Sequence, residues 1–323
     1  MEIIYKSNVL NENWNNDIEK FDYFLLAVGT DLRAYKSIFV AEQNKIEVDN
    51  VVLFNFHERT ESIKKRQSIG SENYKNLSYK TKIYNCSLKN PSAALKELDI
   101  DIKKDSQIAV DISFFTKPFF FTLLNWLKTV CEIENVTIFY TEPKNYVFNK
   151  GLYSEYHSSV GPVSIEEIAS FSGNDANKND SLLIIMLGFD GDLSAELDES
   201  VAPKKTILVN GFPSYSPNFK DISLISNEKV VNKGGNKLVF SRSTNPFDTY
   251  NLLTSIKDKT EYKDLFINIA PIGTKPMALG VCLFALHNPE IRIIYPVPEK
   301  FEDVTSHDSW CTWYYEISLN LNS

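Results

Sequence analysis

Residues 265–286 read LFINIAPIGTKPMALGVCLFAL, and this stretch decides the fold. A short, continuously apolar run stops at a Gly-Thr-Lys-Pro turn, after which the apolar spacing becomes that of a helix. Gly273 allows close approach of the backbone, and Pro276 presets the first helical turn. A continuously apolar strand that leads directly into a helix is typical of a parallel sheet covered on both faces. The stretch therefore predicts one strand–helix unit of an α/β protein.

The same pattern recurs along the chain. Strands, most of them followed by helices, are expected at residues 21–39, 51–59, 81–98, 106–130 and 136–146, and again at 181–197, 205–225, 236–256 and 291–301. Landmark residues repeat in the same order at offsets of 155–159. They pair Gly29 with Gly188, Asp31 with Asp190, Asn90-Pro91 with Asn245-Pro246, Thr116-Lys117-Pro118 with Thr274-Lys275-Pro276, and Tyr140 and Pro143 with Tyr295 and Pro298.

This order predicts an internal duplication. We expect two tandem Rossmann-like units related by a pseudo-twofold axis, each a mostly parallel five-stranded sheet flanked by helices. The alternative is two α/β domains that are alike only because all α/β units are. The predicted boundaries are residues 1–146 for the first unit and 181–323 for the second. Residues 147–180 are expected to be a linker or exposed segment, with a short helix over 164–170 capped by Ser164.

The composition narrows the class of protein. The hydrophobic share of 43% and the aromatic share of 13% exclude disorder as the main state. The net charge of −8 and pI of about 5.2 exclude a general nucleic-acid surface. Four widely spaced cysteines without a C-x-x-C motif indicate free thiols in a reducing compartment. Without an apolar window of membrane length or a signal peptide, we expect a cytoplasmic protein without a membrane partner.

The candidate site residues follow the strands, because ligands of open α/β sheets bind beyond the carboxyl ends of the strands. The predicted ligand-binding residues are Gly29, Thr30, Asp31, Arg33, Ser113, Thr116, Lys117, Gly188, Asp190, Asn245, Gly273, Thr274 and Lys275. A lysine at a helix start opposes the helix dipole. Its occurrence at both Lys117 and Lys275 predicts an anionic ligand at these turns. The alternative is that both lysines point into solvent.

Other motifs are absent from the sequence. Neither half contains the G-x-G-x-x-G or G-x-x-x-x-G-K-[ST] pattern, and there is no G-x-S-x-G elbow, so no nucleotide cofactor and no serine hydrolase are indicated. Asp190 and Asp192 could together hold a metal, but Asp192 fits better as a helix cap, so we predict neither a metal nor a cofactor. His57, Asp31 and Asp190 are the candidate acid–base residues, and a surface role is the alternative for His57.

The Gly273-Thr274-Lys275 turn between an apolar strand and an apolar helix resembles the ligand-binding turn of CRISPR-associated Rossmann-fold (CARF) sensor domains. In that family two such domains meet and bind a cyclic oligonucleotide across their shared face. The related SAVED sensors are similar to two such units fused in one chain. The corresponding turn of the first half, Phe115-Thr116-Lys117, lacks the glycine, so the resemblance does not imply symmetrical binding. It implies a stand-alone sensor, a ring nuclease, or a subunit that signals to a separate effector protein.

Three functions remain open on the sequence. The first is a binding protein for a nucleotide-derived anion, such as a cyclic oligonucleotide, held in the cleft between the halves and acting in prokaryotic antiviral defence. The second is an enzyme that processes a nucleotide or phosphorylated metabolite, with Lys117 and Lys275 stabilising developing charge. The third is a non-catalytic assembly subunit with degenerate pockets. The first and third are favoured, because neighbouring motifs supply no set of nucleophile, base and orienting group.

Overall fold

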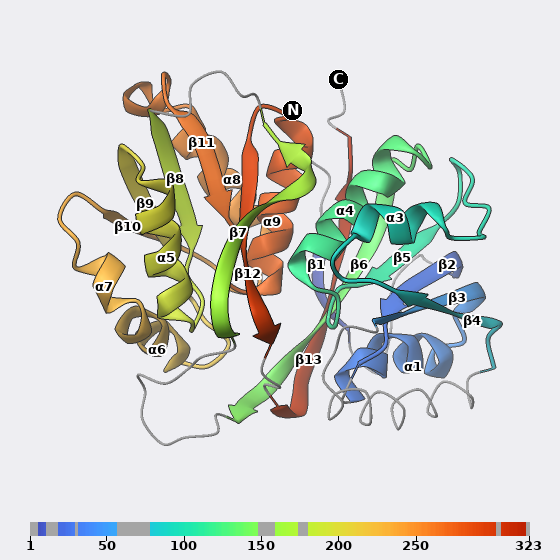
Figure 1. The fold of residues 1–323 in the computed structure, drawn as a ribbon. Helices are drawn as coiled ribbons and strands as arrows, with labels where there is room; N and C mark the ends of the chain where they lie inside the picture. The colour runs from blue at the N-terminus through green and yellow to red at the C-terminus, as the bar shows by residue number, and fades with distance from the viewer. Residues whose placement is uncertain are drawn as a thin grey trace. The chain divides into compact units, whose positions relative to one another are not determined.

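The computed structural model describes residues 6–10, 19–29, 32–56, 78–147, 159–173, 180–301 and 305–320. The chain divides into two compact units, residues 1–147 with 305–323 and residues 148–304. Each unit contains one mostly parallel sheet flanked by helices (Figure 1). The predicted α/β class with two units is confirmed. Within the described ranges no helix is long and apolar enough to cross a membrane.

Unit 1 is built on a seven-stranded sheet of order β1-β13-β6-β5-β2-β3-β4. Its elements are β1 (Lys6–Leu10), β2 (Lys20–Ala27), η1 (Leu32–Tyr35), α1 (Lys36–Gln43), β3 (Glu47–Phe56), β4 (Thr81–Cys86), α3 (Pro91–Lys96), β5 (Ile108–Asp111), α4 (Lys117–Thr129), β6 (Asn135–Val147) and β13 (Thr305–Ser318). Strands β2 to β6 are parallel, whereas β13 runs antiparallel to both β6 and β1. Helix α1 covers one face of this sheet, and α3 and α4 cover the other (Figure 1).

Unit 2 is built on a six-stranded sheet of order β10-β9-β8-β11-β12-β7. Its elements are β7 (Ser159–Ser172), β8 (Ser181–Met186), α5 (Gly191–Val201), β9 (Lys205–Gly211), α6 (Phe219–Ser226), α7 (Glu228–Val231), β10 (Lys237–Ser241), α8 (Pro246–Lys257), η2 (Thr260–Tyr262), β11 (Phe266–Ala270), α9 (Lys275–His287) and β12 (Arg292–Phe301). Among the described strands of this sheet, only β7 runs antiparallel to its neighbour.

The two sheets share one strand order over five strands. The order β4-β3-β2-β5-β6 in unit 1 matches β10-β9-β8-β11-β12 in unit 2. In both, the chain first proceeds outward on one side of the first parallel strand and then crosses to its other side. This crossing creates a topological switch point between β2 and β5, and another between β8 and β11. Each sheet has more strands than the five that the sequence predicts.

The additional antiparallel strands are exchanged between the units. Strand β7 follows β6 in the chain but pairs with β12, and β13 follows β12 but pairs with β6. Each ends opposite the first residue of its partner strand, Ser172 at Arg292 and Ser318 at Asn135. The C-terminal strand therefore completes the sheet of unit 1, whereas the sequence-based division at residues 181–323 grouped it with unit 2.

The helix predicted over residues 164–170 is wrong, because these residues belong to β7. Ile168 and Phe171 are buried, and Ile165 packs against the core around Leu183 and Ile185, so apolar residues recur every third position as in a helix. The spacing arises from a bulge in the strand. Its pairing with β12 shifts register near Arg292, and Ser170 has a positive φ of 72°.

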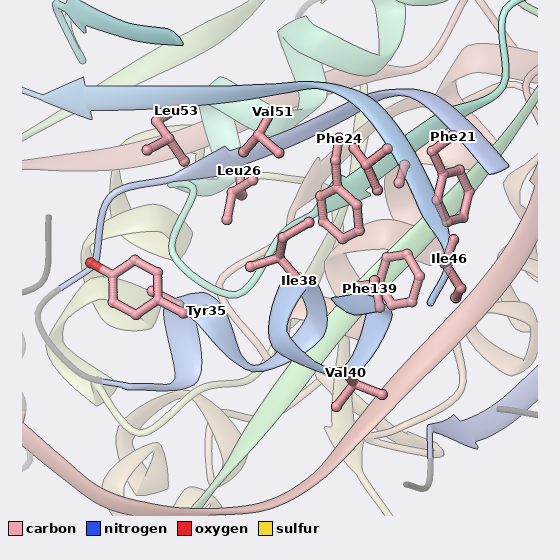
Figure 2. Packing of buried hydrophobic residues seen from close by; sticks show 14 of the residues in the cluster. Phe21, Phe24, Leu26, Tyr35, Ile38, Val40, Ile46, Val51, Leu53 and Phe139 are labelled. Carbon is pink, nitrogen blue, oxygen red and sulfur yellow. The ribbon is translucent and has the colours of Figure 1, made fainter. Parts of the chain in front are cut away.

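The core of unit 1 beneath α1 combines aliphatic side chains with a group of aromatic rings (Figure 2). Phe24 stacks on Phe139 with ring centroids 5.3 Å apart, and Phe21 packs edge-to-face on both. The hydroxyl of Tyr35 donates to the carbonyl oxygen of Gly29 at 3.0 Å. The core thereby fixes the end of β2, where the candidate site begins.

The core of unit 2 is built around β8 and α9. All six residues of β8 are buried, as is every residue of α9 from Pro276 to Leu286. Gly280 lets α9 approach α8, since a Cβ at this position would lie 2.2 Å from the carbonyl oxygen of Pro246. The N-terminus of α9 is consequently fixed at the carboxyl edge of the sheet.

Candidate functional site

The candidate site of each unit lies at its topological switch point, where ligands of open α/β sheets bind. In unit 2 the loops after β8 and β11 are in close contact. A Cβ on Gly188 would lie 2.6 Å from the carbonyl oxygen of Ile272, and a Cβ on Gly273 would lie 3.1 Å from that of Leu187. The close approach of these two loops therefore requires the glycine at position 188, whereas a Cβ at position 273 would displace its neighbour by a few tenths of an ångström.

The corresponding loops of unit 1 also pack together. A Cβ on Gly29 would lie 2.3 Å from Cβ of Ala34 and 2.7 Å from the ring of Phe114, which follows β5. The guanidinium of Arg33 lies 5.1 Å from the centroid of the same ring. Phe114 therefore joins the loop after β5 to the loop after β2, and it places a half-buried cation at this switch point.

The Gly-Thr-Lys turn of unit 2 is anchored through Thr274, the N-cap of α9. Its hydroxyl accepts from the backbone N–H of Met277 at 3.4 Å and donates to the carbonyl oxygen of Ser243 at 2.7 Å. Ser243 also accepts from the hydroxyl of Tyr215 at 3.2 Å. Lys275 is half-buried and is the first residue of the helix. The threonine thus holds the turn, and the lysine supplies positive charge at the helix start.

The equivalent turn of unit 1 is less fully bonded. Thr116 is the N-cap of α4, but its hydroxyl makes no capping hydrogen bond. Lys117 is half-buried, and its ammonium makes no hydrogen bond or ion pair in the part of the chain that the structure describes. Burial lowers the pKa of Lys117 from its ordinary 10.5 to about 7. An anion placed here would stabilise the charged amine and accept hydrogen bonds from both side chains.

Ser113 belongs to a buried polar network behind this turn. Its hydroxyl accepts from the backbone N–H of Thr141 at 2.8 Å, and its own N–H donates to Asp111 at 2.7 Å. Asp111 also accepts from the hydroxyl of Ser37 on α1. The network ties β5 to β6 and to α1, so Ser113 fixes the path of the chain into α4.

Two predicted ligand residues of unit 2 cap helices. Asp190 accepts from the backbone N–H of Leu193 at the start of α5, at 3.4 Å. Asn245 accepts from that of Phe247 at the start of α8, at 3.0 Å. Burial, aided by the charge of Asp190, raises the pKa of Tyr295 to about 12. The side chains of Asp190 and Asn245 thus have structural partners, and their contact with a ligand stays a prediction.

Three other predicted site residues, Thr30, Asp31 and His57, lie outside the described residues. Their roles in binding or acid–base chemistry stay predictions. Among the described residues no group of three or more His, Cys, Asp or Glu side chains could hold a metal ion.

Sequence reasoning missed an aromatic residue at this edge of unit 2. Phe212 directly follows Asn210-Gly211 at the end of β9, and 52% of it is exposed. The ammonium of Lys220 lies 5.5 Å from the centroid of its ring. A large aromatic residue placed directly after a strand and before Pro213 is the signal that could have identified it.

Comparison with known proteins gives matches in structure alone. No family model matches the chain, and no curated protein matches it in sequence. One matching structure is that of a type III CRISPR defence DNA nuclease activated by cyclic oligoadenylate. The TM-score is 0.54, with 11% identity over 84% of this chain. Our chain spans 65% of the length of that one.

A second match is the cytoplasmic domain of a prokaryotic cation chloride cotransporter, with 11% identity over 86% of this chain and 96% of that one. Its TM-score of 0.27 is too low to support an argument. At 11% identity the first match establishes likeness of fold alone. The chain thus has a fold similar to that of a type III CRISPR defence nuclease that cyclic oligoadenylate activates.

Proposed function

We propose that the chain binds a nucleotide-derived anion at its Thr-Lys turns and acts as a sensor in a prokaryotic antiviral defence system. The observation that carries the proposal is the pair of equivalent helix starts. In each unit a thirteen-residue helix begins beside the switch point with a half-buried lysine, preceded by an N-cap threonine. The CRISPR nuclease of similar fold is activated by cyclic oligoadenylate, so this class of ligand is the first to test.

The chemistry of these turns suits a phosphate group. Free N–H groups and the positive end of the helix dipole favour an anion at a helix N-terminus. A half-buried lysine adds a full charge, which is costly in the absence of an anion because burial disfavours the ammonium. In unit 1 neither the hydroxyl of Thr116 nor the ammonium of Lys117 has a hydrogen-bond partner among the described residues, so both can bond to a phosphate oxygen. We therefore expect the ligand to contact unit 1 through these two residues.

We propose a signalling role, in which a separate effector protein responds to the ligand-bound state, rather than catalysis. The enzymatic alternative depends on residues such as His57 and Asp31, and it makes a distinct prediction. An enzyme would convert the ligand during incubation, whereas a sensor would release it intact.

The test is a binding screen by thermal shift and calorimetry with cyclic triadenylate, tetraadenylate and hexaadenylate, and with AMP and ATP for comparison. A ligand that binds the folded state raises its stability by about 2.7 kcal/mol at a hundred times Kd. We expect selective stabilisation by one cyclic oligoadenylate, which chromatography then recovers intact. Losing a charge-assisted hydrogen bond costs about 1.5–3 kcal/mol, so Lys117→Ala and Lys275→Ala should each weaken binding about 10- to 150-fold.

The matched control is Lys36→Ala, which removes an exposed lysine from the start of α1. Its affinity should equal that of the wild-type protein. If no nucleotide stabilises the chain, or if both turn variants bind normally, the proposal is wrong and the assembly-subunit hypothesis replaces it.

A further inference from the structure

Unit 2 presents a small aromatic surface beside its candidate site, formed by Phe212, Phe240 and Lys220. Phe212 and Phe240 are 52% and 47% exposed. Their rings pack edge-to-face with centroids 6.1 Å apart, and the ammonium of Lys220 lies 5.5 Å from the centroid of Phe212. Large aromatic residues left half-exposed at the carboxyl edge of a sheet require an explanation, because this edge is where ligands bind.

The backbone beneath Phe212 is fixed by hydrogen bonds. Its N–H donates to the carbonyl oxygen of Ser241 at 2.7 Å, and the N–H of Ser243 donates to that of Pro213 at 3.1 Å. Gly211 has no side chain that could keep Ser243 away, since a Cβ there would lie 2.2 Å from its hydroxyl oxygen. The ring of Phe212 therefore projects from a well-ordered part of the sheet edge.

Ser243 connects this surface to the Gly-Thr-Lys turn. Its carbonyl oxygen accepts from the hydroxyl of Thr274, the N-cap of α9, at 2.7 Å, and from the hydroxyl of Tyr215 at 3.2 Å. The loop that carries Phe212 and the helix start that carries Lys275 are consequently held by the same residue.

The loop after β8 is connected to the same surface through α6. Lys220 is the second residue of α6, and Phe219 before it packs edge-to-face on Phe189 at 5.3 Å. The carbonyl oxygen of Gly188 accepts from the hydroxyl of Ser223, also on α6, at 3.0 Å. Direct contacts therefore link the loops after β8 and β9 to the starts of α6 and α9 at the carboxyl edge of unit 2.

We propose that the ring of Phe212 stacks on a nucleobase of the bound ligand, with Phe240 supporting its edge. This inference rests on the proposed function and extends it from the phosphate to the base. Two half-exposed rings match the size of one planar base, whereas a stable protein interface needs about 800 Å² from each partner. Stacking on an aromatic side chain contributes about 1–3 kcal/mol per base and is tolerant of base identity. Lys220, which also pairs with Asp221 at 3.1 Å, adds positive charge close to the ligand's phosphates.

The experiment measures the affinity of cyclic tetraadenylate, and of cyclic triadenylate and hexaadenylate, by calorimetry for wild type and variants. Phe212→Ala and Phe212→Leu should both weaken binding about 5- to 150-fold, the loss that corresponds to stacking of one base. Phe212→Tyr keeps the ring and should stay close to wild type. The control is Ile225→Ala, which removes an equally exposed apolar side chain from α6 and should change nothing. Unliganded melting temperatures establish that each variant is folded.

The outcomes separate this inference from the function on which it rests. If wild type binds none of these ligands and neither AMP nor ATP, the proposed function fails and the inference fails with it. If wild type binds and Phe212→Ala binds equally well, only the stacking role is overturned. Equal weakening by Phe212→Ala and Phe212→Tyr also overturns it, because the ring would then not be what matters. A dimer by sedimentation that Phe212→Ala dissociates, with affinity unchanged, assigns the surface to a second copy of the chain instead.

Discussion

Replacing Lys117 by methionine should stabilise unit 1, and by more at low pH than at high pH. Methionine keeps an unbranched apolar side chain but removes the amine. The pKa of Lys117 is lowered from 10.5 to about 7 in the folded protein, so between these values the unfolded state binds more protons than the folded state. The contribution of Lys117 to stability must therefore rise with pH across that window, and the penalty of the buried ammonium is complete only below pH 7.

The magnitude follows from the same shift. One pKa unit corresponds to 1.36 kcal/mol, so the penalty falls by about 2.7 kcal/mol between pH 7 and pH 9. Because the side chain is half-buried, water screens part of this cost. We expect the gain in unfolding free energy from Lys117→Met to be about 1–3 kcal/mol larger at pH 6 than at pH 9.

The assay is urea unfolding followed by intrinsic tryptophan fluorescence. All four tryptophans, Trp14, Trp126, Trp310 and Trp313, belong to unit 1, so the signal reports the unit that contains Lys117. The control is Lys36→Met, at the exposed start of α1, which should show no such pH dependence. An equal gain in unfolding free energy from Lys117→Met at both pH values would refute the claim that burial disfavours the charged form of this amine.

Three further predictions concern packing, topology and a buried acid. Gly280→Ala should destabilise unit 2 by about 1–3 kcal/mol, because the added Cβ would lie 2.2 Å from the carbonyl oxygen of Pro246. Urea unfolding followed by circular dichroism measures this loss, and an unchanged midpoint would contradict the packing of α9 on α8. After cleavage at a protease site engineered into residues 148–158, the two fragments should co-elute in native gel filtration, because β13 of the second fragment pairs with β6 of the first. Separate elution of the fragments would disprove this strand pairing. The carboxylate of Glu142 accepts a hydrogen bond from the indole N–H of Trp313 at 3.0 Å, and burial raises its pKa. Above pH 4.5 the folded state therefore binds more protons than the unfolded state, so the contribution of Glu142 to stability falls as the pH rises. Glu142→Gln should therefore stabilise the protein more at pH 8 than at pH 5 in thermal melts, and the opposite order would count against a buried carboxyl.

The sequence predicts the parallel core well, because its information is local. The apolar run of β8 and the long apolar helix α9 are recognisable from their composition and from the turn between them. The partners of β7 and β13 could not be predicted, since pairing between strands far apart in the chain leaves no local pattern. The helix predicted over β7 rested on Ser164 as an N-cap with Glu167 three residues later, a local motif that occurs here within a strand.

The candidate site was predicted in position more than in detail. Thr116-Lys117-Pro118 and Thr274-Lys275-Pro276 read alike and occupy equivalent helix starts. Only the threonine of the second turn is bonded to a neighbouring carbonyl, that of Ser243, and this difference depends on residues distant in sequence. The exposure of Phe212 could not be predicted, because it depends on the geometry of the sheet and not on the hydrophobicity of the residue.

The exchanged strands have a consequence for how the protein is made. The sheet of the first unit needs β13, which follows every strand of the second sheet in the chain. During translation, β6 therefore stays unpaired along one edge until β13 has been synthesised, whereas β7 is synthesised before any other strand of the second sheet. The first sheet is therefore completed only after all the described strands of the second sheet have been synthesised.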